Sequence, residues 1–167
     1  PGENERPTER RAEPAARCSK GKPFEPARLG EQVTYLASPE LGGRVPGSAG
    51  DVAARAYIVE RFKCLGLTPA GDDGRYEQAF EAVNVATANV VGLIKGSDDT
   101  VGSEIILIGA HHDHIGGKLL GANDNASGVV ALLAIAQAIT ERSSAPRRTI
   151  AFAAFGAEEQ GMVPLLA

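Results

Sequence analysis

Acidic and imidazole side chains gather at three places in the second half of the chain. All three histidines fall in HHDH at 111–114, Asp124 lies in GANDNASG, and Glu158 is followed directly by Glu159. Imidazole nitrogens and carboxylate oxygens are the usual protein ligands of zinc and similar divalent ions. If the fold gathers these groups, their carboxylates would repel one another strongly unless a cation neutralised them. The residue types therefore predict a metal site.

Ligand chemistry suggests a role for each group. His111 can offer a neutral ring nitrogen to a metal, and Asp113 is spaced to accept the other ring N–H. Asp124 has two carboxylate oxygens and could bridge two metals about 3.5–4 Å apart. Adjacent glutamates do not easily face the same metal. One of Glu158 and Glu159 can therefore be a ligand while the other stays free as a base for a reacting water.

Each group also has a purely structural explanation. A His-x-Asp after a strand is usually part of a turn, and Asp124 could cap the following helix. The paired glutamates could complement a helix dipole. Each structural explanation is the commoner one when taken alone, but three such groups at one sheet edge favour a site. His112 and His114 should point away from His111, so we expect them to be second-sphere or surface groups.

The elements around these groups form a strand–helix–strand unit. Residues 104–110 are a continuous apolar run, which predicts a strand covered on both faces. A helical apolar spacing follows at 125–141, and TIAFAAF at 149–155 is a second buried strand. Such a unit forms a right-handed crossover between parallel strands. The ends of both strands and the start of the helix then share one sheet edge, where ligands bind in open α/β folds.

The rest of the chain supplies further helices and strands. We expect a helix over 28–38 and another that starts at the capping pair Ser48 and Asp51 and ends at Gly66. YEQAFEAV and NVVGLIKG predict two more strands. The fold class is therefore α/β, a mixed and largely parallel sheet with helices on both faces. Residues 1–27, rich in Pro, Glu and Arg, predict a disordered charged leader before a domain at 28–167.

Composition excludes several classes of function. The chain has 167 residues, of which 43% are hydrophobic and 23% charged, as in ordinary globular domains. A net charge of −4 argues against a partner bound through nucleic-acid phosphates. No apolar run approaches the roughly 20 residues that a membrane helix needs. The two cysteines fit no disulfide framework, and we expect unpaired thiols rather than a Cys18–Cys64 bridge.

Three motifs in order resemble one family of enzymes. GAHHDH, GANDNASG and AFGAEEQG, with LASPELGGRVPGSAG upstream, are similar to the zinc aminopeptidases typified by bacterial leucyl aminopeptidase, peptidase family M28. The similarity covers about residues 30–161. It implies a three-layer zinc exopeptidase fold and two zinc ions that activate a water. It also implies peptides or proteins with free N-termini as substrates and a secreted or periplasmic location.

The resemblance also assigns the motif residues. His111 resembles a ligand of the first metal and Asp113 its orienting partner. Asp124 resembles the bridging aspartate, Glu158 the general base and Glu159 a ligand of the second metal.

The sequence departs from the family pattern after Glu159. A further carboxylate ligand and a further histidine should follow, but the chain ends at Ala167 with neither, and Pro164 disfavours the usual helix. We expect a truncated domain with exposed apolar sheet surface. Two alternatives to a hydrolase stay open, a non-catalytic peptidase-like binding domain and a single-zinc glutaminyl cyclase. Retention of Glu158 and Glu159 argues against the first, and the GANDNASG motif argues against the second.

Overall fold

The computed structural model describes residues 21–161. Most of the predicted leader and all of the Pro164 region therefore lie outside the described residues. The first helix, α1, begins at Pro26, slightly before the start of the helix predicted at 28–38.

Five strands form one sheet in the order β1-β3-β5-β4, and β2 also pairs with β3. The strands are β1 (Thr68–Pro69), β2 (Glu77–Ala82), β3 (Val85–Ile94), β4 (Ile105–His111) and β5 (Thr149–Phe155). The sheet is mixed, as predicted. It is not largely parallel among the described strands, because β3 runs antiparallel to β1, β2 and β5. Only β4 and β5 are parallel neighbours within residues 21–161.

The predicted strand–helix–strand unit is confirmed. β4 is followed by α3 (Ser127–Thr140), which leads back to β5. In the register of the two strands, Ile105 pairs with Thr149 and His111 pairs with Phe155. Both strands therefore end at the same edge of the sheet, which brings the residues that follow them together.

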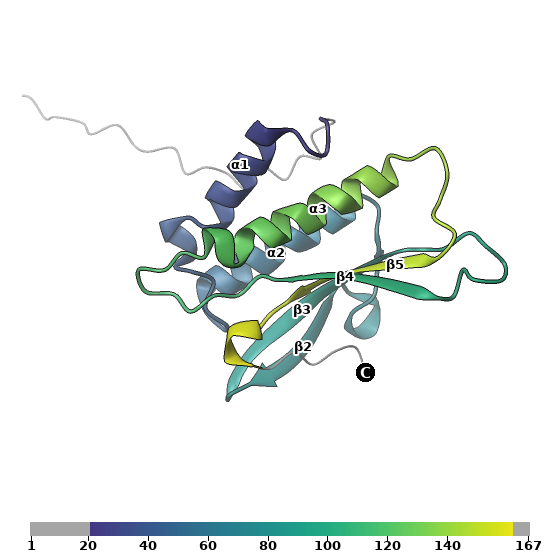
Figure 1. Ribbon diagram of the computed structural model, residues 1–167. Helices are drawn as coiled ribbons and strands as arrows, with labels where there is room; N and C mark the ends of the chain where they lie inside the picture. The colour runs from purple at the N-terminus through teal and green to yellow at the C-terminus, as the bar shows by residue number, and fades with distance from the viewer. Residues whose placement is uncertain (1–20, 162–167) are drawn as a thin grey trace, which may run out of the picture.

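The helices α2 (Ala49–Cys64) and α3 cover one face of the sheet, and α1 (Pro26–Leu36) packs against α3 on the same side (Figure 1). The described helices thus lie on one face rather than on both. As predicted, the Ser48 hydroxyl accepts a hydrogen bond from the Asp51 amide at the start of α2. Gly66, with φ +72°, takes the left-handed conformation that follows a helix end.

Short helical turns complete the described chain. They are η1 (Pro39–Leu41), η2 (Asp72–Gly74), the π-type turn η3 (Ala122–Ala126) and η4 (Glu158–Gln160). No described helix is both long and apolar enough to span a lipid bilayer.

The apolar core lies between the sheet and the helices. Its largest members include Ile58 and Phe62 on α2, Leu132 and Leu133 on α3, and Phe152 on β5. Burial of these side chains is the main stabilising term of the fold.

Two expectations are wrong. β4 is not covered on both faces, since Ile105, Ile106 and Leu107 are 61%, 47% and 41% exposed. The reason is its place at the end of the strand order, where β5 is its one neighbour among the described strands. Exposed apolar sheet surface was expected on other grounds, and it is found here. Cys64 is disulfide-bonded rather than a free thiol; Cys18 lies outside the described residues.

Candidate metal centre

His111, Asp124 and Glu159 come together at the edge where β4 and β5 end. One potential ligand atom from each lies within 4.8 Å of the others. His111 Nε2 is 3.0 Å from Asp124 Oδ1. These are the three residues for which the sequence predicted metal-ligand roles. Within residues 21–161, they form the one group of three or more His, Cys, Asp or Glu side chains that is close enough to hold a metal ion.

Each of the three residues is supplied by a different element. His111 is the last residue of β4, Asp124 lies within η3 ahead of α3, and Glu159 lies in η4 after β5. One alternative explanation was that Asp124 caps α3, and this explanation is wrong. The N-cap position of α3 is Ala126, and the Gly128 amide in the first turn donates a hydrogen bond to Oδ1 of Asn125 at 2.9 Å. The Asp124 carboxylate is left facing His111.

Asp113 fixes the ring of His111. Nδ1 of His111 lies 3.2 Å from the carbonyl oxygen of Asp113 and 3.5 Å from its carboxylate. These acceptors favour the proton on Nδ1, which leaves the lone pair of Nε2 directed at Asp124 and Glu159. The hydrogen bond with the Asp113 side chain raises the pKa of His111 to about 8, against a smaller opposing effect of burial. Without a bound cation, the His111 imidazole is therefore mostly in its positively charged form, with a proton on each nitrogen, at neutral pH.

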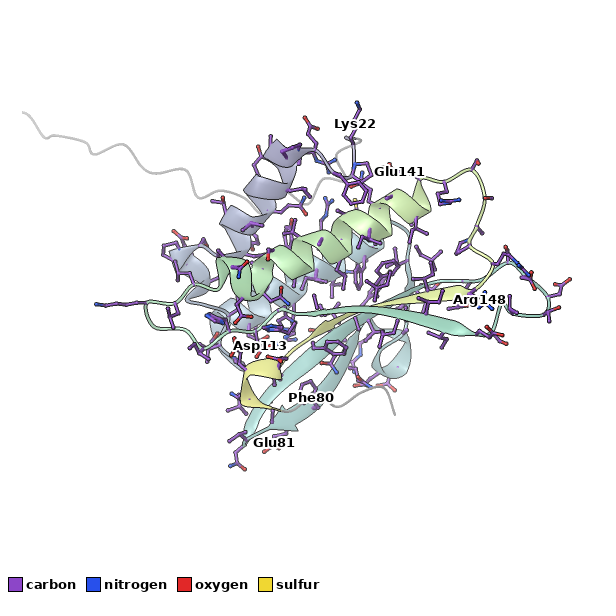
Figure 2. All side chains as sticks on the ribbon, viewed as in Figure 1. Lys22, Phe80, Glu81, Asp113, Glu141 and Arg148 are labelled. Carbon is purple, nitrogen blue, oxygen red and sulfur yellow. The ribbon has the colours of Figure 1, made fainter. Side chains whose placement is uncertain are left out.

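Asp113 also holds the turn that carries the two glutamates. Its Oδ1 accepts from the Glu158 amide at 3.1 Å and its Oδ2 from the Glu159 amide at 3.2 Å. Burial alone would raise the pKa of Asp113, but the hydrogen bonds from His111 and these two amides outweigh it and lower the pKa. Figure 2 shows Asp113 where the end of β4 meets η4. The sequence predicted its contact with His111 and missed its grip on the glutamate turn.

Glu158 lies at the rim of this group. Its Oε2 is 3.9 Å from Nε2 of His111, and its side chain is half exposed, whereas that of Glu159 is mostly buried. One glutamate thus joins the donor group while its neighbour faces it from the solvent side. The division between a ligand and a free base stays a prediction for these two glutamates.

His112 and His114 are not surface groups. His112 is fully buried, and its Nε2 lies 3.0 Å from Oδ1 of Asp51 on α2. His114 is 7% exposed, and its Nδ1 lies 2.6 Å from Oε1 of Glu159. Each of the two rings contacts a carboxylate. His114 is therefore the direct neighbour of a proposed ligand.

Asp51 is the centre of a group of buried polar contacts. From the sequence, only a helix-capping role was predicted for this residue. Its carboxylate accepts hydrogen bonds from the Gly47 amide, the Thr87 hydroxyl and Arg55 Nε, besides His112. Burial raises the pKa of Asp51, but these partners, led by His112, more than offset that effect and lower it. The network joins the start of α2 to the segment next to His111. Nothing in the local sequence marks it, because its members are up to 61 residues apart.

Arg44 is a second residue that the sequence gave no reason to single out. It lies in the glycine-rich turn before α2, is fully buried, and donates hydrogen bonds to backbone carbonyls near the donor group.

The donor set fits a divalent transition metal. It combines one imidazole nitrogen with two carboxylates, and the second ring nitrogen of the histidine already has an acceptor, an arrangement usual for zinc-binding histidines. With only three donors grouped in the described chain, at least one position at such a metal would be open to water or substrate.

Comparison with known proteins finds a similarity to one family. The model of peptidase family M28 matches residues 89–164, which hold all the donor residues described above. Among curated relatives, leupeptin-inactivating enzyme 1 of Streptomyces exfoliatus is 27% identical over 132 residues, which are 79% of this chain and 28% of the relative. A probable zinc metalloprotease of Pyrenophora teres is 36% identical over 97 residues, which are 54% of this chain and 20% of the relative.

Several solved structures share the fold. BSAP, a zinc aminopeptidase from Bacillus subtilis, is 16% identical with a TM-score of 0.63, over 84% of this chain and 63% of BSAP. A glutaminyl cyclase from Bacteroides thetaiotaomicron is 23% identical with a TM-score of 0.63, over 86% of this chain and 50% of the cyclase. The chain thus spans between a fifth and about two thirds of these proteins. The fold is that of a partial zinc exopeptidase domain.

Proposed function

We propose that this chain is part of a zinc-dependent aminopeptidase. The observation that carries the proposal is the grouping of His111, Asp124 and Glu159 within 4.8 Å, with Asp113 holding both the histidine ring and the glutamate turn. The M28 match and the zinc-dependent relatives support the same reaction class.

The chain's own residues divide the work of hydrolysis. Zinc at this site would supply Lewis-acid activation of a water and of a peptide carbonyl. Glu158, half exposed beside His111, accepts the proton of the attacking water and returns it to the departing amine. Asp113 keeps the His111 ring oriented, and His114 does the same for the Glu159 carboxylate through their 2.6 Å contact.

We further propose a site for two zinc ions. His111 and Asp124 would hold one ion, and Asp124 and Glu159 the other, so that Asp124 bridges them. The Asp124 side chain is 62% exposed although one oxygen contacts His111, which leaves its carboxylate room for a second partner. Metal analysis of the purified longer protein tests this: two zinc ions per chain are expected. One ion per chain, with full activity, would contradict the bridging role.

The proposed substrates are peptides and proteins with a free amino terminus. The longer protein should release the first residue of an aminoacyl anilide and leave the same compound untouched after N-acetylation. A chelator should stop the reaction and added zinc should restore it. Equal cleavage of the acetylated substrate would show a peptidase that does not require a free N-terminus.

Glutaminyl cyclisation is the second candidate, because the cyclase from Bacteroides thetaiotaomicron shares the fold over 86% of this chain. The same preparation should be offered a peptide with N-terminal glutamine. Release of ammonia with the peptide bonds intact would favour the cyclase, and release of free glutamine favours the aminopeptidase.

We also propose an oxidising compartment, outside the cytosol. The disulfide at Cys64 supports it, since structural disulfides persist mainly in secreted and periplasmic proteins. Thiol labelling of the native protein without reductant should leave Cys64 unmodified. Full labelling of Cys64 in protein taken from its native source would contradict the proposal.

A further inference from the structure

Arg44 occupies an unusual place for an arginine. It is 0% exposed, in the turn between η1 and α2, and its backbone has φ +58°. A left-handed conformation is uncommon for a residue with a side chain and is energetically unfavourable. A glycine would fit this backbone better, so contacts of the side chain must compensate for the cost.

The guanidinium donates to carbonyls from three parts of the chain. Nε contacts the His112 carbonyl at 2.6 Å, Nη1 the Leu120 carbonyl at 2.9 Å and Nη2 the Gly121 carbonyl at 2.9 Å. Nη1 also donates to the carbonyl of Leu36, the last residue of α1. One side chain thus satisfies four backbone acceptors in the interior.

Two of these parts carry the proposed metal ligands. The His112 carbonyl belongs to the residue between His111 and Asp113, and Gly121 comes three residues before Asp124. The approach is close: a Cβ at Gly121 would lie 2.6 Å from Arg44 Nη2 and 2.8 Å from His114 Cδ2. Arg44 therefore joins the end of β4 to the loop ahead of η3, and the side chains and backbone pack closely at this junction.

We propose that Arg44 is a positioning residue that sets the separation of His111 and Asp124, and with it the affinity of the metal site. The proposal rests on the metal site proposed above. Arg44 touches neither ligand side chain; it acts through the backbone of the two segments that present them. The guanidinium reaches carbonyls on both segments from separate nitrogens of a rigid fork, whereas lysine would have to reach them all from one ammonium nitrogen.

If Arg44 acted only through its charge, its removal would change the zinc affinity in the opposite direction. Asp113 and Asp124 both interact with the Arg44 charge, and a fixed cation near metal ligands repels an incoming metal ion. If charge alone mattered, Arg44→Met would bind zinc more tightly and Arg44→Lys would match the wild type. If position matters, both variants bind zinc more weakly, although lysine keeps the charge.

Zinc titration of the 167-residue chain by calorimetry separates these roles. We expect Arg44→Lys and Arg44→Met each to weaken zinc binding about 10–100-fold, the usual loss when a group that orients a metal ligand is removed. Ile58→Ala, in the buried face of α2, is the control for a general loss of stability. The proposal is overturned if Arg44→Lys keeps wild-type affinity, if Arg44→Met binds more tightly, or if Ile58→Ala at equal loss of Tm weakens binding as much.

Amide hydrogen exchange of the metal-free chain gives a second readout. In Arg44→Lys, exchange should rise in 111–114 and 120–125 and stay at the wild-type level along the paired residues of β3 and β5. Unchanged exchange in those two segments, or an equal rise throughout, overturns the proposal. The metal site of the proposed function fails if the longer wild-type protein binds no zinc, and the exchange data still decide whether Arg44 positions the two segments.

Discussion

The two ends of β4 are built in opposite ways. At its start, Ile105, Ile106 and Leu107 are between 41% and 61% exposed although all three are apolar. Beyond its last residue, His112 and Asp113 are 0% exposed although both are polar. Within a dozen residues, burial therefore runs against hydrophobicity.

The difference shows what determines burial at the site. A buried polar group costs several kcal/mol unless it finds hydrogen-bond partners. Asp113 finds the His111 ring and two amides, and His112 finds Asp51. The chain thus surrounds these groups with partners that hold them in place, whereas the start of β4 has β5 beside it and no comparable set of contacts. Contacts therefore fix the polar side chains where chemistry is proposed to occur. The apolar start of β4 lies exposed at the edge of the sheet.

The largest expected effect tests whether the polar end of β4 is sufficient for catalysis. Assayed as the 167-residue chain with added zinc, the protein should show little or no turnover of aminoacyl anilides. Each proposed ion would have two protein ligands from the grouped donors, whereas catalytic zinc normally has three. The longer protein is the positive control. Turnover by the short chain at the rate of the longer protein, abolished by chelator, would show that other groups complete the site.

The next effect separates base from ligand in the longer protein. Glu158→Gln should keep zinc and lose about 10²–10⁴-fold in kcat, since it removes a proton acceptor and no ligand. Glu159→Gln and Asp124→Asn, the matched changes of charge, should lower zinc content as well as rate. Zinc loss in Glu158→Gln together with zinc retention in Glu159→Gln would reverse the two roles.

A third effect concerns the buried polar network behind the site. Asp51→Asn leaves His112 and Arg55 without their carboxylate partner, so the free energy of unfolding at pH 7 should fall by about 3–5 kcal/mol. The folded pKa of Asp51 is lowered, so its stabilisation is present above the unfolded value of 3.8 and is lost as pH falls through the folded pKa. Urea unfolding at pH 7, 5 and 3 should therefore show the variant and wild type converging in acid. A constant difference across this range would be the contrary result.

The smallest effect compares two isoleucines that pair across the strands. Ile106 of β4 and Ile150 of β5 are register partners, and they are 47% and 8% exposed. Ile150→Val should cost about 0.5–1.5 kcal/mol, the usual loss for one buried methylene. Ile106→Val should stay within about 0.5 kcal/mol of wild type, as surface changes do. Equal losses in thermal or urea unfolding would mean that the start of β4 is covered in solution.

Local patterns in the sequence were sufficient for the elements and for the donors. The apolar runs predicted β4 and β5, the helical spacing predicted α3, and the Ser48–Asp51 pair predicted the start of α2. Because both strands were expected to end at one sheet edge, His111, Asp124 and Glu159 were predicted to lie close together there. The structure confirms this proximity.

The remaining contacts depend on the tertiary fold. An apolar run is the same whether its strand is central or at an edge, so the exposure of Ile105 was not predictable from 104–110. Apart from the contact of Arg44 with Leu36, Arg44 and His112 meet their partners over separations of 61 to 77 residues. No periodicity or motif records which carbonyl or carboxylate lies opposite such a side chain.

The hold of Asp113 on η4 has an evolutionary consequence. It grips the main-chain amides of residues 158 and 159 and not their side chains. These two hydrogen bonds therefore do not depend on which side chains occupy those two positions. Substitution there can change reactivity while the scaffold persists, so one inherited backbone could be adapted to different reactions, or to none, without first having to refold.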